Sequence, residues 1–416
     1  MADDLGYGDL GCYGNTAFAT PNLDALAEAG VRFIDFHANA PVCSPTRAAL
    51  LTGRYQQRCG IEGVVTAKNH RDTGMALEEL TFAEVLRAAG YRTGLFGKWH
   101  LGYQVEFNPT QQGFDEFRGY VSGNVDYHSH IDQTGVDDWW QGVEKAPEQG
   151  YVTDLITRHA VGFIERHRNE PFCLYLPHEA PHYPYQGRAD EAVRKPGAPA
   201  VVRGRLGDCR ATYREMVEVL DQGVGEVVRT VKRLGLERRT FIFFCSDNGA
   251  TPQGSNAPLN GHKGSLWEGG HRVPAMACWP GRLRPGTVSH DTAMTMDLFP
   301  TLAAVAGVPI PGDVHPDGVN LLPALEHGDR LLERTLFWRF GAQKAVRRGP
   351  WKLLVAPREA RGRGRDSKPQ ARLYHLGRDL GEQRDLSRVD PERVRQLRTE
   401  LDAWETQVSA SVDRRT

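Results

Sequence analysis

Apolar runs of strand length recur along the chain, at residues 93–96, 172–176, 240–245 and 274–279. They carry few charged residues, which is typical of strands that are covered on both faces. Helices are predicted over residues 152–168 and 212–234. Strands that alternate with helices indicate an α/β fold, in which a mostly parallel central sheet is flanked by helices.

The pattern changes near residue 330. Beyond it come short strand-like runs at residues 336–340, 344–347, 351–355 and 372–376, then a charged helix over residues 391–407. This pattern predicts a small antiparallel sheet with one helix. We therefore expect two parts, residues 1–330 and residues 331–416. The stretch 357–369, rich in Arg and Gly, is expected to be an exposed loop.

Several helix ends can be recognised from single residues. Pro21 fits the first position of a helix that follows Thr20. Thr81 and Glu84 have the spacing of a capping box. Ser44 is expected to cap a helix that begins with Pro45 and stops at Gly53.

Polar side chains follow the predicted strands. Lys98 and His100 follow the strand at 93–96, His182 lies in the loop after 172–176, and Asp247 and Asn248 follow 240–245. In open α/β sheets, ligands bind beyond the carboxyl ends of the strands. These residues are therefore expected to converge on one edge of the sheet. Lys98 and His100 would face one side if the backbone between them is extended.

Composition narrows the possible partners. Lys and Arg number 51 against 52 Asp and Glu, a formal net charge of -1, so nothing favours a nucleic acid or an anionic membrane. No apolar run approaches the ~20 residues of a membrane-spanning helix. The seven cysteines are scattered without CxxC spacing, which argues against a zinc site or a dense disulfide framework.

One cysteine stands in a distinctive pentapeptide, Cys43-Ser44-Pro45-Thr46-Arg47. Its position at a predicted helix N-terminus favours the binding of an anion, and Arg47 lies within about one turn of the same site. On these residues alone, two interpretations stay open: an anion site, or a capping turn with an incidental cysteine.

Further segments extend this pattern over nearly the whole chain. They include the Asp-Asp pair at residues 3–4 within 2–9, and residues 20–24, 51–54, 97–102, 180–182, 247–249, 263–270 and 373–376. Taken in order with Cys-x-Pro-x-Arg, they resemble the type I, formylglycine-dependent sulfatases of the alkaline phosphatase-like superfamily. The resemblance implies an arylsulfatase-like sulfuric ester hydrolase that releases inorganic sulfate from sulfate monoesters.

The resemblance also assigns residue roles. A formylglycine-generating enzyme would oxidise Cys43 to Cα-formylglycine, the hydrated form of which attacks sulfur. Asp3, Asp4, Asp247 and Asn248, with the modified Cys43, would bind a metal. These four residues offer only oxygen ligands, which suit Ca²⁺, or Mg²⁺, rather than zinc. The resemblance also implies an anion clamp, a set of side chains that holds the sulfate and the modified Cys43. Two of its members would transfer protons. The set comprises Arg47, Lys98, His100, His182 and Lys263.

Within this set, Lys98, His182 and Lys263 are assigned to the sulfate, and Arg47 and His100 to the modified Cys43. His182 is the expected general acid and His100 the expected base. Carbohydrate sulfates are the preferred substrates, because the polar and aromatic loops at 123–130 and 137–140 suit a sugar. Candidate sugar contacts are Asp126, His128 and Trp139, although aromatic residues packed under a surface loop fit the same pattern.

Three other functions are less consistent with these residues. A phosphate mono- or diester hydrolase on the same scaffold would use an unmodified Ser or Thr. A thiolate nucleophile at Cys43 would need Arg47 after a longer loop. A non-catalytic carbohydrate-binding homologue, with Cys43 unmodified, would be expected to lack clamp or metal residues, and none is missing.

The N-terminus departs from the family pattern. Family members place an apolar strand directly before the Asp-Asp pair, but only Met1 and Ala2 precede Asp3. Two residues are too few for a strand of the usual ~5–6 residues. We therefore expect an upstream segment that supplies this strand, and with it any signal peptide, so the compartment stays open, periplasmic or secreted if such a peptide exists.

Overall fold

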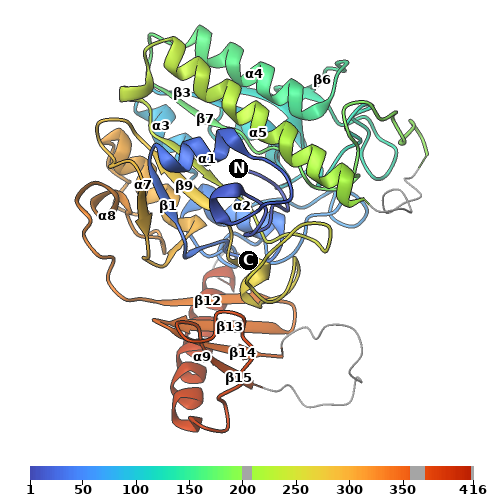
Figure 1. Cartoon of the computed structure of the whole chain (residues 1–416). Coiled ribbons are helices and arrows are strands. Elements are labelled where there is room, and N and C mark those ends of the chain that lie inside the picture. Colours follow the sequence, from blue (N-terminus) through green and yellow to red (C-terminus); the bar gives the residue numbers. More distant parts are fainter. Residues whose placement is uncertain (199–208, 357–370, 414–416) are drawn as a thin grey trace.

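The computed structural model describes residues 1–198, 209–356 and 371–413. The loop expected at 357–369 lies outside the described residues. Two sheets form the centre, with strand orders β10-β1-β9-β8 and β6-β5-β4-β3-β7 (Figure 1). Their strands are β1 (Val31–Phe33), β3 (Arg92–Lys98), β4 (Glu116–Tyr120), β5 (Trp140–Gln141), β6 (Glu144–Lys145), β7 (Phe172–Tyr175), β8 (Ile242–Cys245), β9 (Ala275–Cys278) and β10 (Thr287–Ser289). A separate two-stranded pair joins β2 (Phe36–His37) to β11 (Ala293–Met294).

Strand direction confirms the α/β class and corrects one detail. β3 runs parallel to β4 and β7, and β1 runs parallel to β10. The strand expected at 274–279 is present as β9, but it runs antiparallel to both β8 and β1. The connection from β8 to β9 returns from the same edge of the sheet, and such a return gives an antiparallel neighbour.

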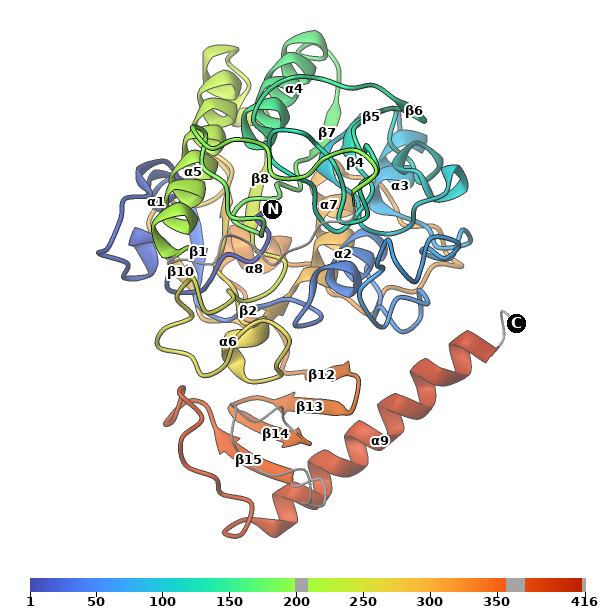
Figure 2. The same ribbon diagram turned by 90° about the vertical axis from the view of Figure 1, so that its right-hand side faces the viewer.

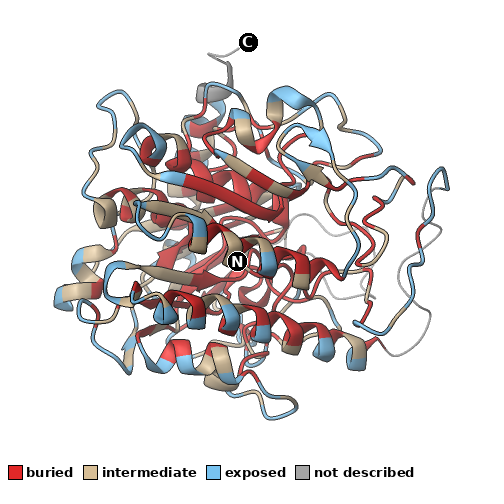
Figure 3. Cartoon of the chain, turned by 90° about the horizontal axis from the view of Figure 1, so that it is seen from above, coloured by how far each residue is buried: buried red, intermediate tan, exposed pale blue. Residues whose placement is uncertain are grey.

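Helices cover both faces of these sheets (Figures 1 and 3). One face packs against α1 (Pro21–Glu28), α4 (Val152–Arg166) and α5 (Arg210–Arg233). The other packs against α2 (Cys43–Thr52), α3 (Phe82–Ala88), α7 (Leu298–Ala306) and α8 (Leu322–His327). Successive side chains of β3 point to opposite faces of the sheet: Phe96 packs on the side of α1, α4 and α5, and Leu95 on the side of α2, α3, α7 and α8. Among the described residues, no helix is both long and apolar enough to span a bilayer.

The predicted helix ends are partly confirmed. Thr81 and Glu84 form a full capping box at α3, Pro21 opens α1, and Gly53 ends α2 in the left-handed region. Ser44 is not the N-cap of α2, because the helix already begins at Cys43 and Val42 is its cap. The Ser44 hydroxyl instead accepts a hydrogen bond from the Val65 amide at 3.1 Å, which ties the motif to the following loop.

The C-terminal residues form the predicted antiparallel sheet, in the order β12-β13-β14-β15, with a long helix against it (Figure 2). The elements are β12 (Thr335–Phe340), β13 (Gln343–Arg348), β14 (Trp351–Val355), β15 (Ala371–His375) and α9 (Pro391–Asp413). This sheet meets the larger part through one shared apolar core and through buried ion pairs such as Lys352–Glu268, with 2.8 Å between the charged atoms. The division at residue 330 stays a prediction.

Candidate active site

The candidate residues gather where β3, β7 and β8 end. The first residues of the chain lie between β7 and β8, since the Ala2 amide donates to the Cys245 carbonyl at 2.9 Å and the Asp3 amide to Ala180 at 3.2 Å. This places Asp3 and Asp4 beside Asp247, the second residue after β8. The predicted convergence is therefore found, but at the carboxyl ends of strands from two sheets, since β3 and β7 belong to one and β8 to the other.

Cys43 is the first residue of α2 and is 2% exposed. Its sulfur and the carboxylates of Asp3 and Asp247 lie within 4.8 Å of one another. Burial raises the pKa of the Cys43 thiol, against the opposing effect of Lys98 and Lys263. An unmodified thiol here is therefore protonated at neutral pH, which does not suit a thiolate nucleophile.

Three cations contact these carboxylates: Arg47 and Lys98 are buried, and Lys263 is half-buried. Arg47 donates to Asp247 at 2.8 Å and to Asp3 at 3.2 Å. Lys98 forms an ion pair with Asp3, and Lys263 forms one with Asp4. Burial alone would raise the pKa of Asp3, but Lys98 and the other nearby cations hold it well below its ordinary value. Burial raises the pKa of Asp4 to about 6 despite Lys263.

Several carboxylate and amide oxygens in this cluster have no hydrogen-bond partner among the described residues. They are Asp3 Oδ1, Asp4 Oδ2 and Asn248 Oδ1, all buried. The Asn248 amide nitrogen donates to Asp4 Oδ1 at 2.8 Å, which leaves the Asn248 oxygen free. Buried oxygens without a donor are costly unless something binds them. This donor set fits a hard divalent cation such as Ca²⁺.

The tight approach of two loops explains the glycine that follows Asn248. A Cβ atom on Gly249 would lie 1.8 Å from the Gly269 carbonyl oxygen, so only glycine fits there. The Gly249 amide also donates to the Gly270 carbonyl at 3.0 Å. The segment that carries Asp247 and Asn248 is thereby fixed against the segment that follows Lys263.

His100 reaches the site by a different route from the one expected. The backbone is not extended there, because His100 has φ +63°, in the left-handed region. Its Nε2 donates to the Val65 carbonyl at 3.0 Å, so Nδ1, which has no hydrogen-bond partner within the described ranges, is the acceptor nitrogen. Burial, with Lys98 and Arg47, lowers the pKa of His100 well below its ordinary value. A neutral imidazole with a free lone pair suits a base.

His182 faces the carboxylates of Asp3 and Asp4 from the loop after β7. Its Nδ1 donates to the Tyr183 carbonyl at 2.5 Å, and its Nε2 lies 3.8 Å from Asp4 Oδ2. Burial, with the positive charge of Lys263, lowers the pKa of His182 well below its ordinary value. The negative charge of a bound ester would oppose this effect and favour the protonated ring.

The three candidate sugar contacts have structural partners instead of free polar groups. Asp126 is fully buried and accepts hydrogen bonds from four backbone amides, including those of His128 and Arg194. Trp139 is 2% exposed and donates to Glu148. The ring of His128 contacts the Gly187 carbonyl at 3.0 Å. Their recorded polar contacts are not with the clamp, so the structure does not bring them together with it.

Sequence reasoning missed Glu179. This residue is fully buried, its Oε1 accepts from the Val125 amide at 2.9 Å, and its Oε2 has no partner among the described residues. Burial raises the pKa of Glu179 well above its ordinary value, against the opposing effect of Lys98. The sequence could have indicated Glu179 as a further candidate, because it lies three residues before His182 in the same loop.

Comparisons with known proteins agree with this site. The Sulfatase family model matches residues 1–308. Human N-acetylgalactosamine-6-sulfatase is 36% identical over 82% of this chain and 67% of its own length, and human arylsulfatase A is 37% identical over 81% and 69%. The crystal structure of Ps i-CgsB in complex with k-i-k-neocarrahexaose has a TM-score of 0.84 and 30% identity, over 97% of this chain and 91% of that one. The chain therefore belongs to the sulfatase family, which is a family of sulfuric ester hydrolases.

Proposed function

We propose that this sulfatase hydrolyses sulfate monoesters of carbohydrates, with a formylglycine made from Cys43 and with Ca²⁺, or Mg²⁺, as its metal. The observation that carries the proposal is the position of Cys43. It lies at the N-terminus of α2, beside three buried carboxylates and the cations Arg47, Lys98 and Lys263, of which only Lys263 is partly exposed. Such an arrangement provides fixed charges for a sulfate group that is losing its ester oxygen.

The metal would be held by Asp3, Asp4, Asp247 and Asn248, together with residue 43. The unpartnered buried oxygens of Asp3, Asp4 and Asn248 support this assignment. When bound, the ion would supply Lewis acidity next to the hydrated aldehyde of residue 43. Arg47 donates hydrogen bonds to the carboxylates of both Asp3 and Asp247 and so holds them in place.

The protein side chains divide the remaining work. Lys98 and Lys263 provide positive charge for the sulfate oxygens. His182, protonated in the presence of the ester, gives a proton to the leaving alcohol. His100, with its free Nδ1, takes a proton from the second hydroxyl of residue 43, so that sulfate can leave and the aldehyde is restored.

Relatives support a carbohydrate substrate. One relative is named for N-acetylgalactosamine-6-sulfate, and Ps i-CgsB was solved with k-i-k-neocarrahexaose. A formylglycine-generating enzyme is the partner that the proposal requires. Because Cys43 is 2% exposed in the folded chain, that enzyme would have to act on this segment before α2 packs.

The test measures both the modification of Cys43 and the hydrolysis of sulfate esters. The chain is produced with and without a formylglycine-generating enzyme, the peptide that contains Cys43 is weighed, and hydrolysis of sulfated and phosphorylated sugars is compared. We expect the aldehyde mass and sulfate release only after co-production. Cys43→Ala should abolish turnover, whereas the control Cys12→Ala, at a partly exposed cysteine in the short 3-10 helix Gly11–Tyr13, should retain it. Full activity in Cys43→Ala would refute the proposal.

A further inference from the structure

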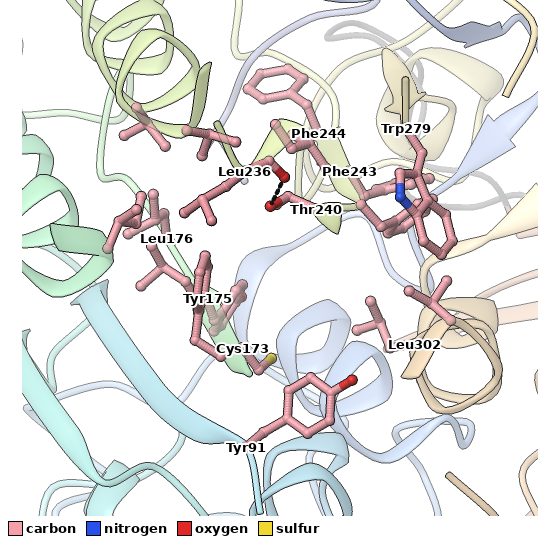
Figure 4. A pocket seen from close by; sticks show the side chains of 18 of the residues that line it. Tyr91, Cys173, Tyr175, Leu176, Leu236, Thr240, Phe243, Phe244, Trp279 and Leu302 are labelled. Carbon is pink, nitrogen blue, oxygen red and sulfur yellow. Dashed lines mark hydrogen bonds between the residues drawn. The ribbon is translucent and has the colours of Figure 1, made fainter. Parts of the chain in front are cut away.

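The cavity between β7 and β8 does not suit a sugar. It has a volume of about 560 Å³, and the side chains around it are mainly apolar, among them Tyr175, Phe243 and Leu302 (Figure 4). Such walls offer few partners for the hydroxyl and anionic groups of a sulfated carbohydrate. Polar side chains that can contact a sugar lie instead at the surface, beside the two expected proton-transfer residues, His100 and His182.

Arg71 is linked to His100 through one aromatic side chain. The Tyr103 hydroxyl donates to the Val65 carbonyl at 3.3 Å, and His100 Nε2 donates to the same carbonyl at 3.0 Å. The guanidinium carbon of Arg71 lies 5.2 Å from the centroid of the Tyr103 ring, a cation–π contact. Arg71 therefore packs on the residue that shares an acceptor with the expected base.

A second set of contacts leads from Arg71 to His182. Arg71 Nη2 donates to the Thr134 hydroxyl at 2.7 Å. The side chain of the preceding residue, Gln133, donates to the Tyr183 hydroxyl at 2.7 Å. The Tyr183 ring stacks on the His182 ring, with 4.6 Å between the centroids and 25° between the planes. The contacts thus connect the expected base, through Arg71, to the expected general acid.

The side chains along this connection are more exposed than the two histidines. His100 is 2% exposed and His182 is 4% exposed. Arg71, whose side chain is 40% exposed, and Tyr183 are half-buried, and Gln133 is exposed. A sugar whose sulfate reaches the buried clamp has to extend toward solvent on the side of the general acid. It would then meet Arg71, Gln133 and Tyr183, which we call the rim.

Arg71 is fixed in place and still has free donors. Its Nη2 donates to Asp132 Oδ2 at 3.0 Å. Asp132 is 2% exposed, and its Oδ1 accepts hydrogen bonds from the Thr134 amide and hydroxyl, both at 2.7 Å, and from the Val136 amide at 3.1 Å. The Nη1 and Nε atoms of Arg71 have no hydrogen-bond partner within the described ranges. A guanidinium held in this way loses little entropy when it binds, and its planar N–H groups match the oxygens of an anionic group.

We propose that Arg71 binds a second anionic group, a carboxylate or a further sulfate, on the sugar whose sulfate ester occupies the clamp. Gln133 and Tyr183 would contact the same sugar, one as a hydrogen-bonding group and the other as an aromatic surface. Hydrogen bonds to a charged group are stronger than those between neutral groups, so Arg71 would favour such a sugar over one that carries only hydroxyls there. The proposal rests on the proposed function only for the position of the ester.

The experiment measures binding without turnover. Isothermal titration calorimetry is performed in Ca²⁺ buffer on the Cys43→Ala chain, which does not consume the ligand. N-acetylgalactosamine 4,6-disulfate is compared with N-acetylgalactosamine 6-sulfate. The disaccharide of glucuronic acid and N-acetylgalactosamine 6-sulfate is compared with its carboxyl-reduced form. We expect at least one doubly anionic ligand to have a dissociation constant about tenfold or more below that of its matched ligand.

Two further variants, made in the Cys43→Ala chain, separate recognition from a structural role. Arg71→Gln should weaken the binding of the doubly anionic ligand by about tenfold or more, and that of the matched ligand much less. If Arg71 only held the two loops together, both ligands would lose affinity by the same factor. The control is Arg92→Gln, at the opposite end of β3 from Lys98. Arg92 pairs with Glu170 at 3.0 Å, and its side chain is 54% exposed, so this variant should keep the difference between the ligands.

Each outcome decides a point. A difference within the uronic acid pair assigns the rim to a carboxylate, and a difference within the disulfate pair assigns it to a second sulfate. The proposal is overturned if neither pair differs, if Arg71→Gln weakens both members of a pair equally, or if Arg92→Gln abolishes the difference as well. None of these measurements uses sulfate hydrolysis, so failure here is separate from failure of the proposed formylglycine chemistry.

Discussion

Lys352 offers a sharp test of how the C-terminal sheet is held to the rest of the protein. Its side chain is fully buried in β14, and its Nζ lies 2.8 Å from Glu268 Oε1 and 3.0 Å from Glu382 Oε1. Glu268 belongs to α6 (Glu268–His271), which follows the loop of Lys263. Burial alone would raise the pKa of Glu268, but Lys352 and neighbouring cations hold it well below its ordinary value. Glu268 is therefore a buried carboxylate that depends on its partners.

We expect Lys352→Met to lower the free energy of unfolding by about 3 kcal/mol, because removal of one partner from a buried ion pair typically costs about 3–5 kcal/mol. The lower end of that range applies because Arg272, 3.2 Å from the other oxygen of Glu268, remains. Methionine keeps most of the volume of the side chain, so the loss measures the stranded charge instead of a cavity.

The assay is urea denaturation of Lys352→Met beside a matched surface variant, Arg398→Met. Arg398 pairs with Asp402 at 2.9 Å within α9, and the two side chains are 42% and 54% exposed. A pair of this kind contributes about 0.5 kcal/mol or less. If the two variants lose the same free energy of unfolding, the buried ion pair does not stabilise the contact, and the reasoning is refuted.

Four further outcomes are expected. Lys98→Ala and Lys263→Ala should each lower turnover by about 10²–10³-fold, as for other preorganised charges; wild-type rates would remove them from the clamp. His182→Ala should slow alkyl sulfates far more than nitrophenyl sulfates, and equal losses would exclude it as general acid. Chelation should lower both Tm and turnover, with Ca²⁺ but not zinc restoring them. Burial lowers the pKa of His37 and His271, so protons bind the unfolded chain first. The contribution of these two histidines to the free energy of unfolding is complete above about pH 6.5. It is lost as pH falls, by up to about 1.4 kcal/mol per pH unit for each residue. A free energy of unfolding that stays constant from pH 7 to 5.5 would contradict this.

Local signals in the sequence predicted most elements of the fold. Pro21, the capping box at Thr81 and Glu84, and Gly53 each act within one helical turn, and each is found where it was expected. The direction of β9 was not predicted, because it depends on the path of the whole connection from β8. The sequence pattern of a buried strand is the same for either direction.

The candidate site shows the same division between local and distant causes. The resemblance was needed to group Asp3 and Arg47 with Asp247, and in the structure Arg47 lies 3.2 Å from Asp3 and 2.8 Å from Asp247. The left-handed backbone at His100 was not predicted. A histidine carries no local signal for positive φ, and the conformation is held by contacts with distant residues such as Val65. A Cβ on Gly123 would lie 2.6 Å from the His100 ring, so the fit depends on that glycine as well.

The least predictable feature is the support that the C-terminal sheet gives to Lys263. The Gln343 side chain, at the start of β13, donates to the Gly264 carbonyl at 3.0 Å and accepts from the Leu266 amide at 3.3 Å. These contacts join residues almost 80 positions apart, and no pattern in either segment predicts them. A loop that presents a cation to an anion needs its backbone fixed, since a mobile lysine gives less electrostatic stabilisation than a preorganised one. Contacts from β13 thus hold the loop of Lys263 in place across the boundary that the sequence predicts at residue 330.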